Sequence, residues 1–146
     1  MLVGTYKYSV DSKNRVCIPP KFRNDFGGRC MISKDIADDC INLHSMERWT
    51  AYTGEIEKLP SIEMSELKKS VYAYADEVEI DSQGRIILNQ KICEKVGLAG
   101  EKEIIIIGHL THAQIWNVEA WEKYEKNLNS KETKESIKTK LKELKF

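Results

Sequence analysis

Two short polar segments with identical spacing each carry an acidic and a basic side chain that could act together. Residues 11–15 read Asp-Ser-Lys-Asn-Arg, and residues 81–85 read Asp-Ser-Gln-Gly-Arg. An aspartate at the start of a tight turn accepts hydrogen bonds from backbone N–H groups two residues on and fixes the loop. The arginine at its end carries a planar fork of donors that suits phosphate oxygens or guanine edges. The spacing predicts a rigid turn, used twice, that presents a guanidinium group.

Each pair also has a purely structural use, as a local salt bridge that braces a hairpin. We favour this turn-bracing use for Asp11 and Asp81. An exposed salt bridge contributes only about 0–1 kcal/mol to stability, whereas a guanidinium on a rigid turn is well placed to contact nucleic acid. We therefore expect Arg15 and Arg85 to project outward.

Charge is distributed unevenly along a chain that is neutral as a whole. The 146 residues include 23 basic and 23 acidic side chains, which argues against a general binder of polyanions. Residues 1–30 nevertheless carry +4, whereas residues 31–60 and 61–100 carry −3 and −2. A small basic face suffices for phosphate contact when assembly multiplies it. The residues that we expect to bind DNA are Arg15, Lys13, Lys21, Arg23 and Arg85.

Both turns belong to a longer internal repeat with an offset of 70 residues. Val16-Cys17-Ile18 corresponds to Ile86-Ile87-Leu88, directly after the two turns. After a slip of two residues, residues 43–49 correspond to residues 115–121. A repeat at a fixed offset indicates one structural unit used twice.

Each copy predicts the same order of elements: a strand, the polar turn, a short strand, a short helix, two more strands and a second helix. Asn14 and Gly84 suit the turn because both residue types tolerate positive φ, and Gly27 and Gly97 are expected to end the short helices. The expected ranges are 6–10, 16–18, 20–26, 31–32 and 40–44 in the first copy and 76–80, 86–88, 90–96, 104–107 and 113–116 in the second, followed by helices capped by Ser45 and Asn117.

Two helical segments lie outside the repeat. Residues 61–73, after Pro60, predict a linking helix capped by Ser61. Beyond about residue 126 the chain is rich in Lys and Glu, which predicts a solvated helix that is frayed or partly disordered. A partner-binding helix is the alternative for this tail.

The composition describes a soluble globular protein, with 41% hydrophobic and 32% charged residues. No run approaches the roughly 18 apolar residues of a membrane helix, and residues 1–7 lack the layout of a signal peptide. The cysteines are scattered without a Cys-x-x-Cys pair, which predicts reduced and mostly buried thiols. They are Cys17, Cys30, Cys40 and Cys93.

Enzymatic catalysis is the alternative to a DNA-binding function. His109-x-x-His112 could suggest a metal pair, but no Cys or acidic residue accompanies it at a familiar ligand spacing. His44 corresponds to Trp116 in the repeat, so we expect it to serve packing. The chain has no glycine-rich phosphate loop and no Gly-x-Ser-x-Gly elbow. We therefore expect no enzyme activity, metal site, cofactor or small-molecule ligand.

These residues together resemble the MraZ family of bacterial transcriptional regulators, which are tandem relatives of AbrB- and MazE-type DNA-binding domains. The resemblance covers residues 1 to about 126. The motifs that carry it are Gly4 with Tyr6, Asp11-x-x-x-Arg15, Ile18-Pro19-x-Lys21-Phe22-Arg23, Val78-x-Ile80-Asp81-x-x-Gly84-Arg85-Ile86, Gly97-Leu98, the apolar strand ending at Gly108, and Ile115-Trp116-x-x-x-x-Trp121.

The resemblance implies an α+β fold: a double-split, swapped-hairpin β-barrel made by two tandem AbrB-like halves, with peripheral helices and a helical C-terminal tail. The expected parts are a first repeat (1–60), a linking helix (61–75), a second repeat (76–126) and a charged tail (127–146). It further implies a cytoplasmic, nucleoid-associated protein that forms a ring-like homo-oligomer, for example an octamer. Such a ring would bind short direct repeats of double-stranded DNA upstream of its own gene, in a division and cell-wall operon.

The second copy departs from the family pattern at two positions. Asn89 stands where members usually have Pro after the apolar triplet, and Cys93 stands where they have a basic residue. The DNA-binding role is therefore expected mainly of the first copy. The alternative function is an AbrB/MazE-type antitoxin that binds DNA through its barrel and a toxin through its tail.

Overall fold

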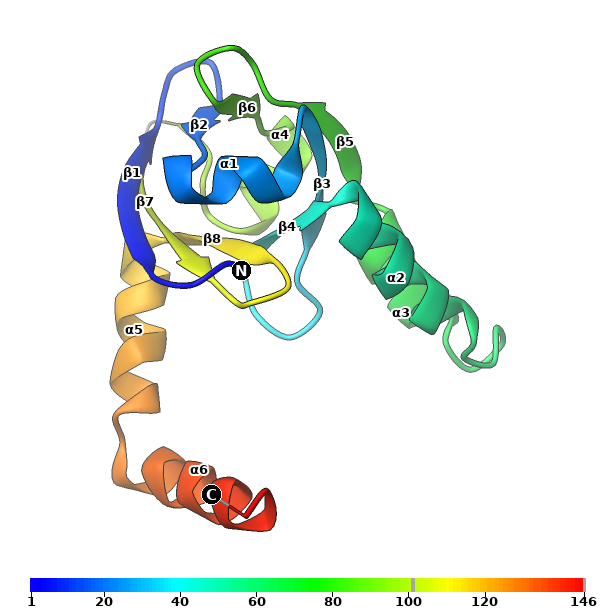
Figure 1. Cartoon of the computed structure of the whole chain (residues 1–146), viewed down its shortest axis with the longest axis vertical. Helices are drawn as coiled ribbons and strands as arrows, with labels where there is room; N and C mark the ends of the chain where they lie inside the picture. The colour runs from blue at the N-terminus through cyan, green and yellow to red at the C-terminus, as the bar shows by residue number, and fades with distance from the viewer. Residues whose placement is uncertain (101, 146) are drawn as a thin grey trace.

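The computed structural model describes residues 1–100 and 102–145, and its architecture is mixed α+β (Figure 1). A six-stranded antiparallel sheet and a two-stranded ribbon form its centre. The first copy contributes β1 (Thr5–Val10), β2 (Arg15–Cys17), α1 (Pro20–Phe26), β3 (Arg29–Lys34), β4 (Ile41–Ser45) and α2 (Met46–Glu57). The second contributes β5 (Asp76–Glu79), β6 (Arg85–Ile87), α4 (Gln90–Lys95), β7 (Lys102–Gly108), β8 (Ala113–Asn117) and α5 (Val118–Leu128). Helix α3 (Ser65–Tyr72) lies between them in sequence, and α6 (Lys131–Glu143) follows. The order expected from the repeat is confirmed.

The two copies exchange their first strands. Strand β1 pairs with β7 of the second copy, and β5 pairs with β3 of the first copy. The six-stranded sheet has the order β1-β7-β8-β4-β3-β5, so the central pair β8–β4 also joins the copies, as does the separate ribbon β2–β6. Neither copy can therefore complete its sheet without the other.

One core is shared by both copies. Ile32 of β3 and Ile104 of β7 are fully buried, as is Ile92 of α4, and Phe22 of α1 is 1% exposed. Burying one such side chain stabilises the fold by roughly 1.5–3 kcal/mol. The polar turns are therefore anchored on a hydrophobic core that residues of both copies form.

The cysteines are free, as expected, and three of the four are buried. Cys17 is partly exposed, whereas Cys30, Cys40 and Cys93 lie in the interior. Burial raises the pKa of the Cys30 thiol to about 12. Because the thiolate is the reactive form, this thiol is chemically inert at neutral pH.

The predicted glycine stops after α1 and α4 and the predicted N-caps of α2 and α5 are confirmed. Gly27 and Gly97 adopt positive φ, 69° and 72°, just beyond α1 and α4. The Ser45 side chain accepts a hydrogen bond from the backbone N–H of Arg48, and Asn117 accepts from that of Glu119. These caps satisfy N–H groups that have no partner within the helix.

The predicted start of the linking helix is wrong. Residues 61–64 form a turn, the N-cap position is Met64, and α3 starts only at Ser65, so Ser61 does not cap it. A short helix needs tertiary packing to be stable. Val71 of α3 is fully buried, whereas Ile62 in the turn is 95% exposed, so the helix forms only where it packs.

The C-terminal helices project away from the sheet (Figure 1). The tail is helical and solvated, as expected, with Ser130 capping α6 through the N–H of Thr133. The boundary expected at residues 126/127 falls inside α5, which ends at Leu128. Among the described residues, no helix has the length and apolar character to span a membrane.

Candidate nucleic-acid interface

The first polar turn is closed by the aspartate that begins it. Asp11 Oδ1 accepts hydrogen bonds from the backbone N–H groups of Lys13 and Arg15, both at 2.9 Å. The backbone N–H of Asn14 donates to the Asp11 carbonyl at 3.1 Å. Asn14 completes the turn with φ 58°, a left-handed conformation that asparagine tolerates.

The second turn reproduces this geometry. Asp81 Oδ1 accepts from the backbone N–H groups of Gln83 and Arg85, both at 2.9 Å. The N–H of Gly84 donates to the Asp81 carbonyl at 2.9 Å, and Gly84 has φ 77°. Two segments that lie 70 residues apart therefore form the same rigid device.

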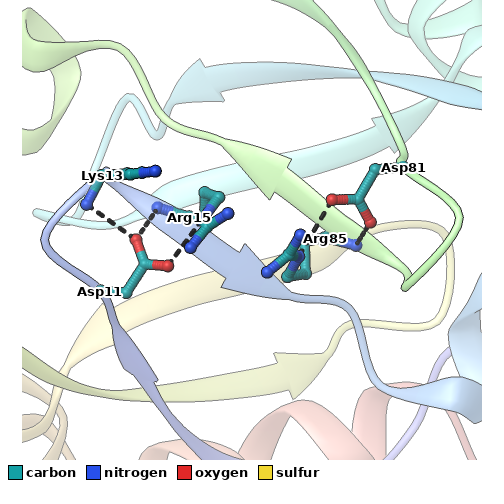
Figure 2. Close-up of polar contacts among 5 residues, drawn as sticks. All are labelled: Asp11, Lys13, Arg15, Asp81 and Arg85. Atoms are coloured by element: carbon teal, nitrogen blue, oxygen red, sulfur yellow. Dashed lines mark hydrogen bonds and ion pairs between the residues drawn. The ribbon is translucent and has the colours of Figure 1, made fainter.

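Each aspartate also holds its arginine from one side. Arg15 Nε donates to Asp11 Oδ2 at 2.7 Å, and Arg85 Nε donates to Asp81 Oδ2 at 2.9 Å. Figure 2 shows the two arginines over the ribbon, between the two aspartates. Within residues 1–100 and 102–145, the terminal Nη atoms of these arginines make no hydrogen bond. The hydrogen bond from Nε to the aspartate thus orients each guanidinium group and leaves its terminal amino groups to bind an acceptor.

The same hydrogen bonds keep the aspartates ionised. The backbone N–H of Arg15 lowers the pKa of Asp11, with further help from its side chain and from the N–H of Lys13. The backbone N–H of Arg85 lowers the pKa of Asp81 in the same way. Both carboxylates therefore remain charged near neutral pH and continue to hold the arginines.

The register of the β2–β6 ribbon gathers both arginines on one face. Arg15 lies opposite Ile87, and Cys17 lies opposite Arg85. Directly opposed side chains share a face, and so do residues two apart on a strand. These four residues therefore form the outer face, which we call the ribbon face.

Cys17 and Ile87 are members of the ribbon face that the sequence interpretation missed. Val16 and Ile86 between them are 1% and 0% exposed, whereas Ile87 is 60% exposed. The signal was the alternation within the two apolar triplets, since the middle residue of a strand triplet faces away from its neighbours.

The two turns are locked to each other across the copies. The backbone N–H of Ile18 donates to the Gly84 carbonyl, and the N–H of Leu88 donates to the Asn14 carbonyl, both at 2.8 Å. Each turn is thus held by the strand that follows the other turn. This pair of contacts holds the two turns next to each other across the ribbon.

Arg23 has a different place from the other predicted residues. It is half-buried, and its Nε donates to the Ile18 carbonyl at 3.1 Å. Its guanidinium group lies against Gly84 and leaves no room there for a Cβ. Arg23 therefore joins the first helix to the turn of the second copy, while its repeat equivalent Cys93 is buried.

The basic residues beside the ribbon face differ between the two copies. Lys13 and Lys21 are exposed at the first turn and the start of α1, and neither forms an ion pair within the described chain. Gln83 occupies the position of Lys13 in the second copy. The paired Asp and Arg charges cancel. Lys21 has an exposed equivalent, Lys91, near the start of α4, so the unequal charge of the two copies comes from Lys13 and Arg23, whose equivalents are Gln83 and Cys93.

The histidines form a packed stack outside the ribbon. The ring of His44 lies 4.9 Å from that of His112 and 5.0 Å from that of Tyr52, and the rings of His109 and His112 are 4.7 Å apart. His44 is 4% exposed, and burial lowers its pKa to about 4. Over the described residues, no group of three His, Cys, Asp or Glu side chains could hold a metal ion. His44 serves packing, as expected.

Comparison with known proteins identifies the family. The sequence model of the family described as "MraZ protein, putative antitoxin-like" matches residues 1–69 and 71–143. The chain belongs to the MraZ family. This confirms the resemblance that the two turns carry.

Named relatives in the MraZ family match along nearly the whole chain. A protein of Acetivibrio thermocellus named transcriptional regulator MraZ is 37% identical over 126 residues, which cover 85% of this chain and 86% of the relative. The protein of the same name from Caldicellulosiruptor bescii is 37% identical over 131 residues, covering 88% and 90%. That from Clostridium tetani is 34% identical over 126 residues, covering 85% and 87%.

Proposed function

We propose that this MraZ-family protein is a transcriptional regulator that binds double-stranded DNA sequence-specifically through the ribbon face. The observation that carries the proposal is the pair of braced arginines, which share one face of a two-stranded ribbon and whose Nη atoms have no hydrogen-bond partner among the residues that the structure describes. The major groove of B-DNA admits a two-stranded β-ribbon. The names of the relatives, which call them transcriptional regulators, agree with this role.

The residues of the ribbon face and the basic residues beside it would have separate tasks on DNA. Arg15 and Arg85 would donate to the O6 and N7 atoms of guanine, and Ile87 would contact a thymine methyl group. Lys13 and Lys21 would contact phosphates and fix the register without reading sequence. Arg23 would act partly through the scaffold, because its Nε is already engaged with the Ile18 carbonyl. The first copy, which has Lys13 and Arg23 where the second has Gln83 and Cys93, would provide most of the affinity.

A neutral subunit with so small a basic surface gains affinity by assembly. We propose a ring-like homo-oligomer, such as an octamer, whose ribbon faces meet successive short direct DNA repeats. Linked sites convert later contacts into intramolecular ones and raise the overall affinity. The exchange of β1 and β5 between the copies supports a double-split, swapped-hairpin barrel as the unit of this ring. The proposed parts are 1–60, 61–75, 76–126 and 127–146.

The DNA site that we propose lies upstream of the gene for this protein, within a division and cell-wall operon. The protein would then be cytoplasmic and associated with the nucleoid, with neither enzyme activity nor a small-molecule ligand. A footprint on that upstream DNA tests the proposal. Regularly spaced protected repeats are expected, and absence of protection at low salt with purified protein would refute it.

The second candidate function is an antitoxin that binds DNA and a toxin. Two observations favour it: the family description contains the words antitoxin-like, and α6 carries exposed apolar side chains. The duplication argues against it, since antitoxins of this type usually combine one copy with a long extended tail. A pull-down from the host separates the candidates, because an antitoxin retains a toxin in a fixed stoichiometric ratio.

A further inference from the structure

Helix α2 of the first copy is covered by the helix that follows it. Lys68 Nζ of α3 forms an ion pair with Glu57 Oε2 of α2 at 3.3 Å, and the Tyr72 hydroxyl donates to Glu57 Oε1 at 3.3 Å. The ring of Tyr72 also packs edge-on against that of Trp49. Ile56 of α2 is only 6% exposed.

Helix α5 is the repeat equivalent of α2, and its corresponding face is uncovered. An offset of 72 residues places Trp121 at the position of Trp49 and Leu128 at that of Ile56. Leu128 is only half-buried where its equivalent Ile56 is 6% exposed, and α5 has no buried residue at all. Trp121 is half-buried, as Trp49 is. Within the described chain, no side chain of α6 forms an ion pair or a hydrogen bond with the side chains of α5.

Helix α6 carries the complementary surface. Ile137, Leu141 and Leu144 recur at helical spacing and are 43%, 46% and 67% exposed. Residues three and four apart share a helix face, so these side chains form one apolar stripe.

The connection between α5 and α6 holds this stripe away from its own α5. Seven residues separate α2 from α3, but only Asn129 and Ser130 separate α5 from α6. The backbone N–H of Asn129 donates to the Glu125 carbonyl at 3.1 Å, and that of Ser130 donates to the Asn127 carbonyl at 3.1 Å. With this short, hydrogen-bonded link, α6 leaves α5 at a steep angle (Figure 1).

We infer that α6 of a second copy of this chain packs on α5, in the position that α3 holds on α2. Ile137 and Leu141 would cover Trp121 and Leu128. Lys138 would then stand where Lys68 stands, with Glu125, one turn before the equivalent of Glu57, as its acidic counterpart. The inference rests on the assembly proposed above and assigns that assembly an interface.

Matched substitutions on opposite faces of α6 test the inference. Leu141→Glu places a charge on the stripe, and Thr139→Glu places the same charge on the far side of the helix. Light scattering after size exclusion measures the mass, and circular dichroism during heating checks the fold. Leu141→Glu is expected to lower the oligomer to single subunits at micromolar concentration with an unchanged melting curve. Thr139→Glu is expected to keep the parent mass.

Complementation tests the partner of the stripe. Leu128→Glu damages the α5 surface and leaves α6 intact, so this variant is also expected to be a single subunit. An equal mixture of Leu128→Glu and Leu141→Glu retains one intact pairing and is expected to form a 1:1 dimer. A dimer in the mixture, with neither variant associating alone, identifies α5 and α6 of different copies as the interface.

The outcomes separate this inference from the proposed function. A Leu141→Glu protein with the parent oligomeric mass overturns the α6 interface and leaves the proposed ring and DNA binding standing. A parent protein that is monomeric removes both the ring and the interface, while the footprint still decides DNA binding. A toxin recovered in a fixed ratio with the parent, and lost with Leu141→Glu, assigns the stripe to the toxin and overturns the inference.

Discussion

The replacement Arg15→Ala tests the ribbon face most directly. The Arg15 side chain is 29% exposed and its partner Asp11 is 38% exposed, so their ion pair contributes only about 0–1 kcal/mol to stability. The two backbone N–H bonds to Asp11 Oδ1 do not involve the lost side chain, so the turn keeps its closure. The free energy of unfolding is therefore expected to change by less than about 1 kcal/mol.

The effect on DNA binding is expected to be much larger. A guanidinium group that binds one guanine bidentately contributes about 1–3 kcal/mol of discrimination, which corresponds to roughly a 5- to 150-fold change in affinity for each occupied site. In an oligomer that engages several repeats these losses multiply, so specific binding should disappear in a gel shift with the upstream DNA. Arg15→Lys should lose most of the same affinity, because a lysine cannot both hold Asp11 and present a planar fork.

Arg85→Ala is the matched control, since its turn has the same hydrogen bonds. It is expected to weaken binding less than Arg15→Ala, because the second turn has Gln83 where the first has Lys13. Thermal unfolding and mass measurements on both variants exclude general damage. An Arg15→Ala protein that binds the parent operator with unchanged affinity would show that the braced arginine serves only the turn, and the assignment of the ribbon face would be withdrawn.

Three further results are expected from the same geometry. Lys13→Gln should lower DNA affinity evenly across sequences and reduce the slope of log affinity against log salt by about one phosphate contact for each subunit bound. Gln83→Lys should raise the affinity and steepen this slope. Equal slopes for the parent and both variants would contradict a phosphate contact at this position. Gly84→Ala should lower the free energy of unfolding in urea by about 1–2 kcal/mol or more, because its φ of 77° and the side chain of Arg23 both oppose a Cβ, whereas Asn14→Gly should cost little. Burial lowers the folded-state pKa of His44 to about 4, so the unfolded chain binds the proton first; stability is full above about pH 6.5 and is lost as pH falls toward 4. His44→Phe should reduce the fall in melting temperature over that window, with a remaining share from the neighbouring His112, whose pKa burial also lowers to about 4. An unchanged slope would show that His44 does not contribute.

The sequence by itself determined the repeated unit and the local structure of its turns. Asp-x-x-x-Arg sets hydrogen bonds within five residues, and Asn14 and Gly84 allow the positive φ that closes each turn. Caps such as Ser45 depend on residues only three positions apart. Such features were predictable because short-range sterics and hydrogen bonding decide them with little help from the rest of the chain.

Only the tertiary structure decided how the two units combine. The exchange of β1 and β5, the register that sets Arg15 opposite Ile87, and the contact of Arg23 with Gly84 all join residues far apart in sequence. The late start of α3 was likewise decided by tertiary packing. The sequence of residues 61–64 favours a helix, but these residues do not pack against the rest of the protein as α3 does. Long-range pairing is selected by the burial of a shared core, and the spacing of residues along one segment does not encode which distant strand completes its sheet.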